Sequence, residues 1–433
     1  MSCQSTLENG IRIVTQKMEG VRSVSVGFLF DASPGYERPK KSGAAHLTEH
    51  LMFKGTPNRD ADAIAHMVDA TGGSISAFTS RDYTCYSATV LDDYITYVLD
   101  LFGDIFLNSE FSEASVRQEK ESVKHELLAS CDRPDIFVHE QLKGHIWKTH
   151  PLGRPIGGTV QSVAQLERQD ILDYVDENYR ADRLIIGAAG NLDHHDFVAK
   201  VEDVVWAMKS GSTTLGIPHK AEFSSGLVVS SKDIRHAYFA IGIRAVSFAD
   251  PARYGIHLLN AIVGEGISSR LFQRLRSSLG LVYEVQSEYQ AYRDDGVIVI
   301  EGATSPESLD QVIEEIFSEL QQIAAGETPI TDEELWKAKM QLKGRHMIAG
   351  ENSATIMSNL VTQTFYFDRY IDFNEIMRQI EEIDTRHLNT IGSEVFKNGL
   401  AQAAVSIIGP ENSERCRQSC LEQTLNKVQK QFH

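Results

Sequence analysis

The sequence contains no apolar run long enough to cross a membrane. Its most apolar segments, 184–190 and 297–300, are short and end at a glycine or an acid, whereas a membrane-spanning helix needs about 20 apolar residues. Proline is scarce, with 11 residues, and 42% of the chain is hydrophobic, which excludes the disordered, collagen-like and low-complexity classes. We therefore expect a globular protein that does not span a membrane.

Cysteines are few, and no targeting segment is evident. The five cysteines form an odd, sparse set, which is typical of free thiols in a reducing compartment. Cys416 and Cys420 lack the second pair of ligands that a zinc knuckle needs. The first residues, MSCQSTLENGIRIVTQ, have neither an apolar signal core nor an Arg- and Ser-rich leader pattern. These features predict a cytoplasmic protein.

Basic residues are outnumbered by acids. With 42 Lys and Arg against 60 Asp and Glu, the net charge is −18, the wrong sign for binding a phosphate backbone or an anionic bilayer. We therefore expect no nucleic-acid partner and no membrane surface partner. If the acids line a cavity they favour cationic ligands, and if they are spread over the outside they keep the protein in solution.

The chain is long enough for two hydrophobic cores, and its second half repeats the pattern of segments of its first half. Its 433 residues exceed the roughly 100 to 200 residues of one domain. Segments in the first half recur about 218 residues later in the same order: a strand, a helix, two strands and two helices, with Ser112 and Thr331 as predicted N-caps. The matched segments are 24–30 with 237–243, 43–53 with 254–264, 75–90 with 282–302, 91–106 with 309–324, and 112–128 with 331–347.

This order predicts an α+β protein made of two homologous repeats. A stretch rich in Gly, Ser and Thr without periodicity, 209–226, predicts a linker. The expected domains are an N-terminal repeat at 1–208 and a C-terminal repeat at 227–433.

The segment HLTEH at 46–50 carries the residues of a metal site. His46 and His50 are four apart, so on a helix both imidazoles leave one face and can bind one cation, while Glu49 is close enough to reach a water on that cation. This inverted form of the HExxH motif suits zinc, with a carboxylate as general base.

A third ligand is expected in the charged segment 117–128, where Glu119 and Glu126 are seven apart and share a helix face. A solvated, charged helix is the alternative interpretation of this run. The second half has Ala338 and Arg345 at the matching positions and no HxxEH. Both differences fall in the same repeat, which favours one metal site, in the first half.

The run GYERPKKSGAAHLTEHLMFKGT at 35–56, together with the spacing from His50 to Glu126, resembles the pitrilysin-type inverzincin peptidases, in particular their half-length, mitochondrial-processing-peptidase-like branch. The resemblance covers nearly the whole chain. It implies that His46, His50 and Glu126 bind Zn²⁺, one ion per chain, that Glu49 is the base, and that Glu119 is a supporting carboxylate. It also implies repeats built from a mixed sheet of about six strands with helices packed on one face.

Two further stretches resemble substrate-binding elements of this family. Ser76, Ala77 and Phe78 lie in a segment that resembles the edge strand to which an extended peptide adds. The family usually has Asn at the position of Ser76. Arg276 and Tyr283, seven apart, resemble the pair that binds the substrate backbone near the scissile bond.

The resemblance therefore implies a zinc-dependent endopeptidase that acts on extended peptides or unstructured precursor segments. The alternatives are a non-catalytic partner or scaffold subunit of a processing-peptidase-like complex, and a structural zinc protein. Full-length family members use four such repeats to enclose the substrate. A chain with two repeats is therefore expected to form a homodimer, or a heterodimer with a related subunit, in which the partner supplies Arg276 and Tyr283.

Overall fold

The computed structural model describes residues 2–38, 40–211, 221–410 and 414–432. The chain forms two compact units, and neither is continuous in sequence. The first unit comprises Met1–Leu128, Arg154–Ile217 and His346–Ile371, and the second comprises Ala129–Gly153, Pro218–Arg345 and Asp372–His433. No helix within the described ranges is both long and apolar enough to traverse a bilayer.

The first unit is built on a six-stranded mixed sheet in the order β1-β2-β6-β3-β5-β4. All neighbours are antiparallel except β2 and β6, which are parallel. The central strand β3, SVSVGFLF, is buried along nearly its whole length, as its continuous apolar run requires. The strands are β1 (Ser2–Thr6), β2 (Arg12–Lys17), β3 (Ser23–Phe30), β4 (Ser74–Thr79), β5 (Thr84–Leu91) and β6 (Leu184–Gly190).

One face of this sheet packs on helices that come from the same half of the sequence. Phe28 on β3 contacts Phe102 and Phe106 on α3, with ring centroids 4.7 and 5.4 Å away, and these rings lie in the largest hydrophobic core. Besides Pro134–Ile146, which packs on the second sheet, the helices of this half are α1 (Ala44–Leu51), α2 (Ala61–Ala70), α3 (Ile95–Asn108), α4 (Glu113–Asp132), α6 (Val160–Ala164), α7 (Arg168–Asn178) and α8 (His194–Val205), with short 3₁₀ turns at Pro34–Tyr36, Asp92–Tyr94 and Ala181–Arg183.

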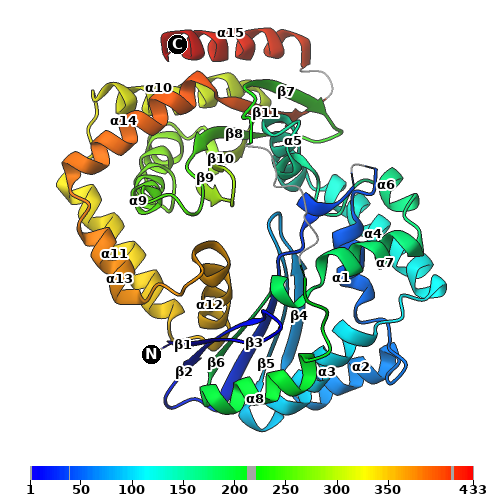
Figure 1. Cartoon of the computed structure of the whole chain (residues 1–433). Coiled ribbons are helices and arrows are strands. Elements are labelled where there is room, and N and C mark those ends of the chain that lie inside the picture. The colour runs from blue at the N-terminus through cyan, green and yellow to red at the C-terminus, as the bar shows by residue number, and fades with distance from the viewer. Residues whose placement is uncertain (1, 39, 212–220, 411–413, 433) are drawn as a thin grey trace. The chain divides into compact units, whose positions relative to one another are not determined.

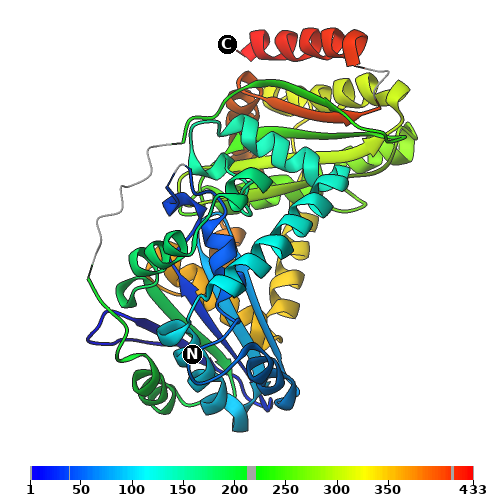
Figure 2. The same ribbon diagram turned by 90° about the vertical axis from the view of Figure 1, so that its right-hand side faces the viewer.

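The second unit repeats this plan with one strand fewer among the described residues. Its sheet has the order β7-β11-β8-β10-β9, and again one pair, β7 with β11, is parallel. The strand that has no counterpart is β1. The elements are β7 (Gly226–Ser231), β8 (Ala237–Ala245), α9 (Arg253–Val263), the π-helix η5 (Phe272–Ser278), β9 (Val282–Ala291), β10 (Gly296–Thr304), α10 (Leu309–Ala325), α11 (Asp332–Ala349), α13 (Phe373–Glu381), α14 (Thr385–Ala401), β11 (Ala404–Gly409) and α15 (Glu414–Phe432), with 3₁₀ turns at Pro151–Gly153 and Pro306–Ser308. Helix α15 lies beside β7 (Figures 1 and 2).

The two halves exchange one helix each. Helix α12 (Ser353–Phe367) packs on β2, β3 and β6 of the first sheet, and α5 (Pro134–Ile146) packs on β8 and β11 of the second. Their first residues are 219 positions apart, so they are the same element of the repeat. A Cβ atom at Gly187 would lie 2.4 Å from Val361 Cγ1, so glycine at this position allows α12 to approach the sheet closely.

The exchange refines the predicted fold. The α+β class, the two repeats and the mixed sheets are confirmed, and Ser112 and Thr331 accept N-capping bonds from Ser115 and Glu334. Helices were expected on one face of each sheet, and the opposite face carries the exchanged helix. The predicted domains, 1–208 and 227–433, are contiguous, whereas the compact units are not. Much of the predicted linker 209–226 lies outside the described residues.

Candidate metal centre

Helix α1 separates a buried apolar side from a polar side. Ala44, Ala45, Leu47, Thr48 and Leu51 are buried in the core of the first unit. The remaining side carries His46, Glu49 and His50, and the two imidazole centroids are 4.7 Å apart. The helical spacing of HLTEH therefore places its two histidines side by side, as predicted.

Helix α4 brings Glu126 to the same place. Glu126 Oε2 lies 3.8 Å from His46 Nε2 and 3.6 Å from His50 Nε2. In a tetrahedral zinc site, donors about 2.0–2.2 Å from the ion are about 3.3–3.5 Å from one another. Two imidazoles and one carboxylate at these separations fit zinc, with small movements of the side chains. These three residues form the one group of at least three potential ligands found in the described part of the chain.

Glu119 contacts this cluster through His50. Only 3% of Glu119 is exposed, and its Oε2 lies 3.3 Å from His50 Nδ1. A carboxylate on the far nitrogen of a histidine fixes the tautomer that leaves Nε2 free to bind a metal. Glu119 Oε1 also pairs with Lys54 Nζ at 2.8 Å. Sequence reasoning missed Lys54, which lies three residues beyond Leu51, the last residue of α1.

Glu49 is held by a hydroxyl group. Thr79 Oγ1, at the end of β4, donates to Glu49 Oε2 at 2.6 Å. Burial raises the pKa of Glu49, and the Thr79 hydrogen bond partly opposes the rise. Burial and the neighbouring His50 lower the pKa of His46 and so favour the neutral imidazole. Thr79 was also missed, although it lies in the strand that the sequence associated with substrate.

Strand β4 is an edge strand, as the sequence interpretation requires. It pairs with β5 alone among the described strands, with Ser76 opposite Ser87 and Phe78 opposite Cys85. Ser76 and Phe78 are exposed, whereas Ala77 packs against the core. The strand contacts α1, the helix that carries His46 and His50.

Arg276 and Tyr283 meet in the second unit. The Arg276 guanidinium lies 4.9 Å from the Tyr283 ring centroid and 5.0 Å from that of Phe272. Tyr283, near the start of β9, is 81% exposed. The structure therefore pairs these two residues with each other and leaves the tyrosine accessible.

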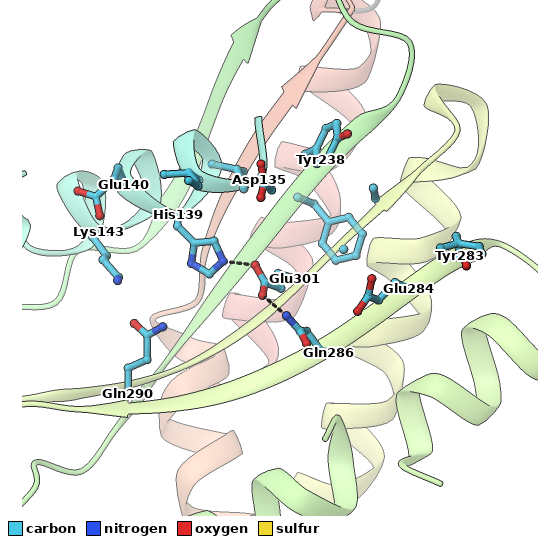
Figure 3. A pocket seen from close by; sticks show the side chains of 15 residues that line it. Asp135, His139, Glu140, Lys143, Tyr238, Tyr283, Glu284, Gln286, Gln290 and Glu301 are labelled. Atoms are coloured by element: carbon cyan, nitrogen blue, oxygen red, sulfur yellow. Dashed lines mark hydrogen bonds and ion pairs between the residues drawn. The ribbon is translucent and has the colours of Figure 1, made fainter. Parts of the chain in front are cut away.

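Tyr283 also lines a cavity of about 530 Å³ within the second unit (Figure 3). The cavity lies between α5 and strands β8, β10 and β9. At its centre, Glu301 bonds to His139 and accepts a hydrogen bond from Gln286 Nε2 at 2.6 Å. Its charged lining comprises Asp135, Glu140, Glu284 and Glu301 with Lys143, so acids outnumber bases on its walls.

The second repeat has no equivalent metal cluster within the described residues. Asn260 and Ala261 on α9 stand at the positions of Glu49 and His50, and Ser287 Oγ donates to Asn260 Oδ1 at 2.7 Å. Arg345, at the position of Glu126, pairs with Glu265. In this repeat, the amide of Asn260 therefore stands where the first repeat has the carboxylate of Glu49, and the cation Arg345 stands where it has Glu126.

Comparisons with known proteins agree with this division. Residues 12–160 match the model of "Insulinase (Peptidase family M16)", and residues 165–342 match "Peptidase M16 inactive domain". An uncharacterized zinc protease of Bacillus subtilis, YmxG, is 32% identical, covering 93% of this chain and 98% of its own. A zinc protease of Rickettsia felis is 31% identical over 94% of this chain and 97% of its own.

Solved structures share the fold. A protease from Helicobacter pylori has a TM-score of 0.87 at 22% identity, covering 95% of this chain and 99% of its own. A peptidase M16 inactive domain protein from Pseudomonas fluorescens has a TM-score of 0.85 at 19% identity, with coverages of 94% and 98%. Together with the curated relatives, these matches show that the chain belongs to the pitrilysin-type peptidases, the insulinase family M16.

Proposed function

We propose that this protein is a zinc-dependent endopeptidase with one zinc ion per chain, bound by His46, His50 and Glu126. The observation that carries the proposal is the convergence of these three side chains. Glu126 of α4 meets the face of α1 that carries His46, Glu49 and His50. The relatives named zinc proteases support the same metal and the same class of reaction.

Each residue has a defined task in this proposal. Zinc, when bound, supplies a Lewis acid and lowers the pKa of a water molecule. Glu49 accepts a proton from the attacking water and then delivers it to the leaving amine. Glu119 holds His50 in the orientation seen here. The exposed hydroxyl of Tyr283 and the guanidinium of Arg276 bind the substrate backbone, and Tyr283 donates to the developing oxyanion.

Measuring zinc content and peptidase activity in two variants distinguishes the proposed base from the proposed ligands. Glu49→Gln should keep zinc and lose peptidase activity, because the ligands survive while the base does not. Glu126→Gln should lose most of its zinc as well. Glu121 is a matched control, since it is on the same helix but pairs with Lys124 at 2.9 Å, and Glu121→Gln should retain both. Wild-type cleavage by Glu49→Gln would refute the mechanism, and full zinc occupancy in Glu126→Gln would point to another third ligand.

The proposed substrate is an extended peptide or an unstructured precursor segment. The free edge of β4 can pair with a strand, and a folded protein has no strand to give. We further propose a preference for basic peptides, because four carboxylates and one lysine line the cavity of Figure 3. A mass-spectrometric cleavage profile on a peptide library tests the preference. Native globular proteins should be left intact. Their cleavage at the rates of peptides would refute the proposal that the substrate is an extended or unstructured segment.

The proposed active unit is a homodimer in which each zinc site uses Arg276 and Tyr283 of the other chain, and a heterodimer with a related subunit is the alternative. The zinc ligands belong to the first unit and the pair belongs to the second, where Tyr283 is accessible. Mixing two inactive variants tests whether each zinc site is shared between the two chains. Glu49→Gln and Tyr283→Phe homodimers should each be nearly inactive. A mixed dimer would contain one intact site, so activity should recover toward half that of wild type after subunit exchange. No recovery after verified exchange would show that each chain builds its own site.

A non-catalytic partner subunit is the second candidate. The match of residues 165–342 to an inactive domain favours it. Purified protein that binds zinc and cleaves no member of the library would support this candidate.

A further inference from the structure

The first turn of the metal-binding helix has no capping side chain of its own. Its N-cap is Gly43, with φ +96°, a conformation that suits glycine, and glycine has no side-chain oxygen to accept hydrogen bonds. The N–H groups at the start of any helix lack partners within the helix. In α1 these groups directly precede His46, so their partners determine how firmly this imidazole is placed.

A glutamate from outside the helix supplies the missing acceptor. Glu37 Oε1 accepts hydrogen bonds from the backbone N–H of Gly43 at 3.0 Å and of Ala45 at 2.9 Å. The backbone of Glu37 is itself fixed on both sides. Its N–H donates to Pro34 O at 3.3 Å, and its carbonyl oxygen accepts from Arg154 Nη1 at 3.1 Å.

The carboxyl group is deeply buried. Only 5% of Glu37 is exposed, and burial raises its pKa to about 8 although the two backbone donors lower it. Burying a carboxyl group is unfavourable unless hydrogen bonds compensate. The two backbone hydrogen bonds come from the N-cap and the first turn of α1, and Arg154 and Ser42 also offset the cost of burial.

We propose that Glu37 is a positioning residue of the metal centre, whose buried oxygen replaces the absent N-cap side chain and thereby fixes the direction of His46. The inference rests on the proposed metal site. His46 lies in the first turn and is the ligand that fraying of this turn would displace, whereas His50 lies a turn further on and is held separately by Glu119.

The test compares variants that keep or remove the acceptor. Glu37→Gln retains an oxygen of the same reach, Glu37→Met has none, and Glu37→Asp is one methylene too short to reach both N–H groups. We expect Glu37→Gln to bind Zn²⁺ within about threefold of wild type, and Glu37→Met and Glu37→Asp to bind it at least tenfold more weakly in chelator competition, a range known for residues that orient metal ligands. The visible spectrum of the Co²⁺-substituted protein should change in the last two variants alone.

Asp104 provides the control for a general loss of stability. It is buried in the same unit and accepts hydrogen bonds from Thr56, Asn58 and Asn108, none of which belongs to α1. Asp104→Asn should lower Tm but leave zinc affinity and the Co²⁺ spectrum unchanged.

Three results would overturn the inference. The first is wild-type zinc affinity in Glu37→Met or Glu37→Asp, and the second is equal loss in Glu37→Gln and Glu37→Met. The third is failure of both Glu37→Met and Glu37→Asp to fold, because Glu37 would then serve the whole unit and not the metal site. Absence of zinc binding by the wild type would instead refute the proposed function.

Discussion

Glu119 offers a quantitative test of the metal centre. Its two oxygens serve two donors, His50 Nδ1 at 3.3 Å and Lys54 Nζ at 2.8 Å, and the group is almost completely buried. Glu119→Gln keeps the shape but leaves a single acceptor oxygen, so its NH₂ group must face one of the two donors. A buried donor without a partner costs about 1–3 kcal/mol. If His50 bears this cost when it binds zinc, the affinity falls about 5- to 150-fold, which overlaps the 10- to 100-fold typical of such supporting residues.

The assay is zinc affinity by competition with a chelator, with circular dichroism to verify folding. Lys54→Met is the companion variant, because it leaves the bond between Glu119 and His50 in place, and its loss of affinity should be smaller than that of Glu119→Gln. Zinc binding within twofold of wild type by Glu119→Met, which offers no acceptor to either donor, would refute the assignment of Glu119 as the group that orients His50.

Three further outcomes are expected. Removing the metal with a chelator should lower the Tm of wild type, because a ligand bound only by the folded state stabilises it, whereas Glu126→Gln should show almost no response in the same thermal scan. Leu360→Ala should reduce the free energy of unfolding by about 2–5 kcal/mol in denaturant titration, since Leu360 is fully buried between α12 and the first sheet, and a change below 1 kcal/mol would contradict that packing. Burial raises the pKa of Glu37 to about 8, above about 4.3 in an unfolded chain. The stability that this group contributes is therefore fully present below pH 4 and is lost as the pH rises to 8. With chelator present, the free energy of unfolding of wild type relative to Glu37→Gln should decline across that window, and a constant difference would be inconsistent with a raised pKa.

The sequence predicted that His46, His50 and Glu126 form a cluster because most of its geometry is local. His46 and His50 are one turn apart on one helix, and Glu119 and Glu126 are two turns apart on another, so helical periodicity alone placed each pair on one face. The family resemblance added that the two helices meet. Lys54 and Thr79 could not be found in this way, because their roles depend on which element packs against α1, and this is a tertiary property.

The exchange of α5 and α12 was not predictable for a related reason. An amphipathic pattern shows that a helix needs an apolar surface, but it does not say which sheet provides it. The two sheets are copies of one plan, so either could accept either helix by pattern alone. Close packing selects between them, as at Gly187 beneath Val361.

The exchanged helix has a consequence for how the protein is made. The last strand of the first sheet ends at Gly190, but α12 ends at Phe367, about 180 residues later. At a synthesis rate of roughly 5–20 residues per second, the ribosome needs about 10–35 s to cover that distance. During this interval Val14, Leu29 and Ile185 lie on a sheet face that still lacks its covering helix. The nascent N-terminal half is thus expected to stay protease-sensitive and dependent on chaperones until the second half emerges, and a gene cut between the repeats would leave each product holding the helix that the other needs.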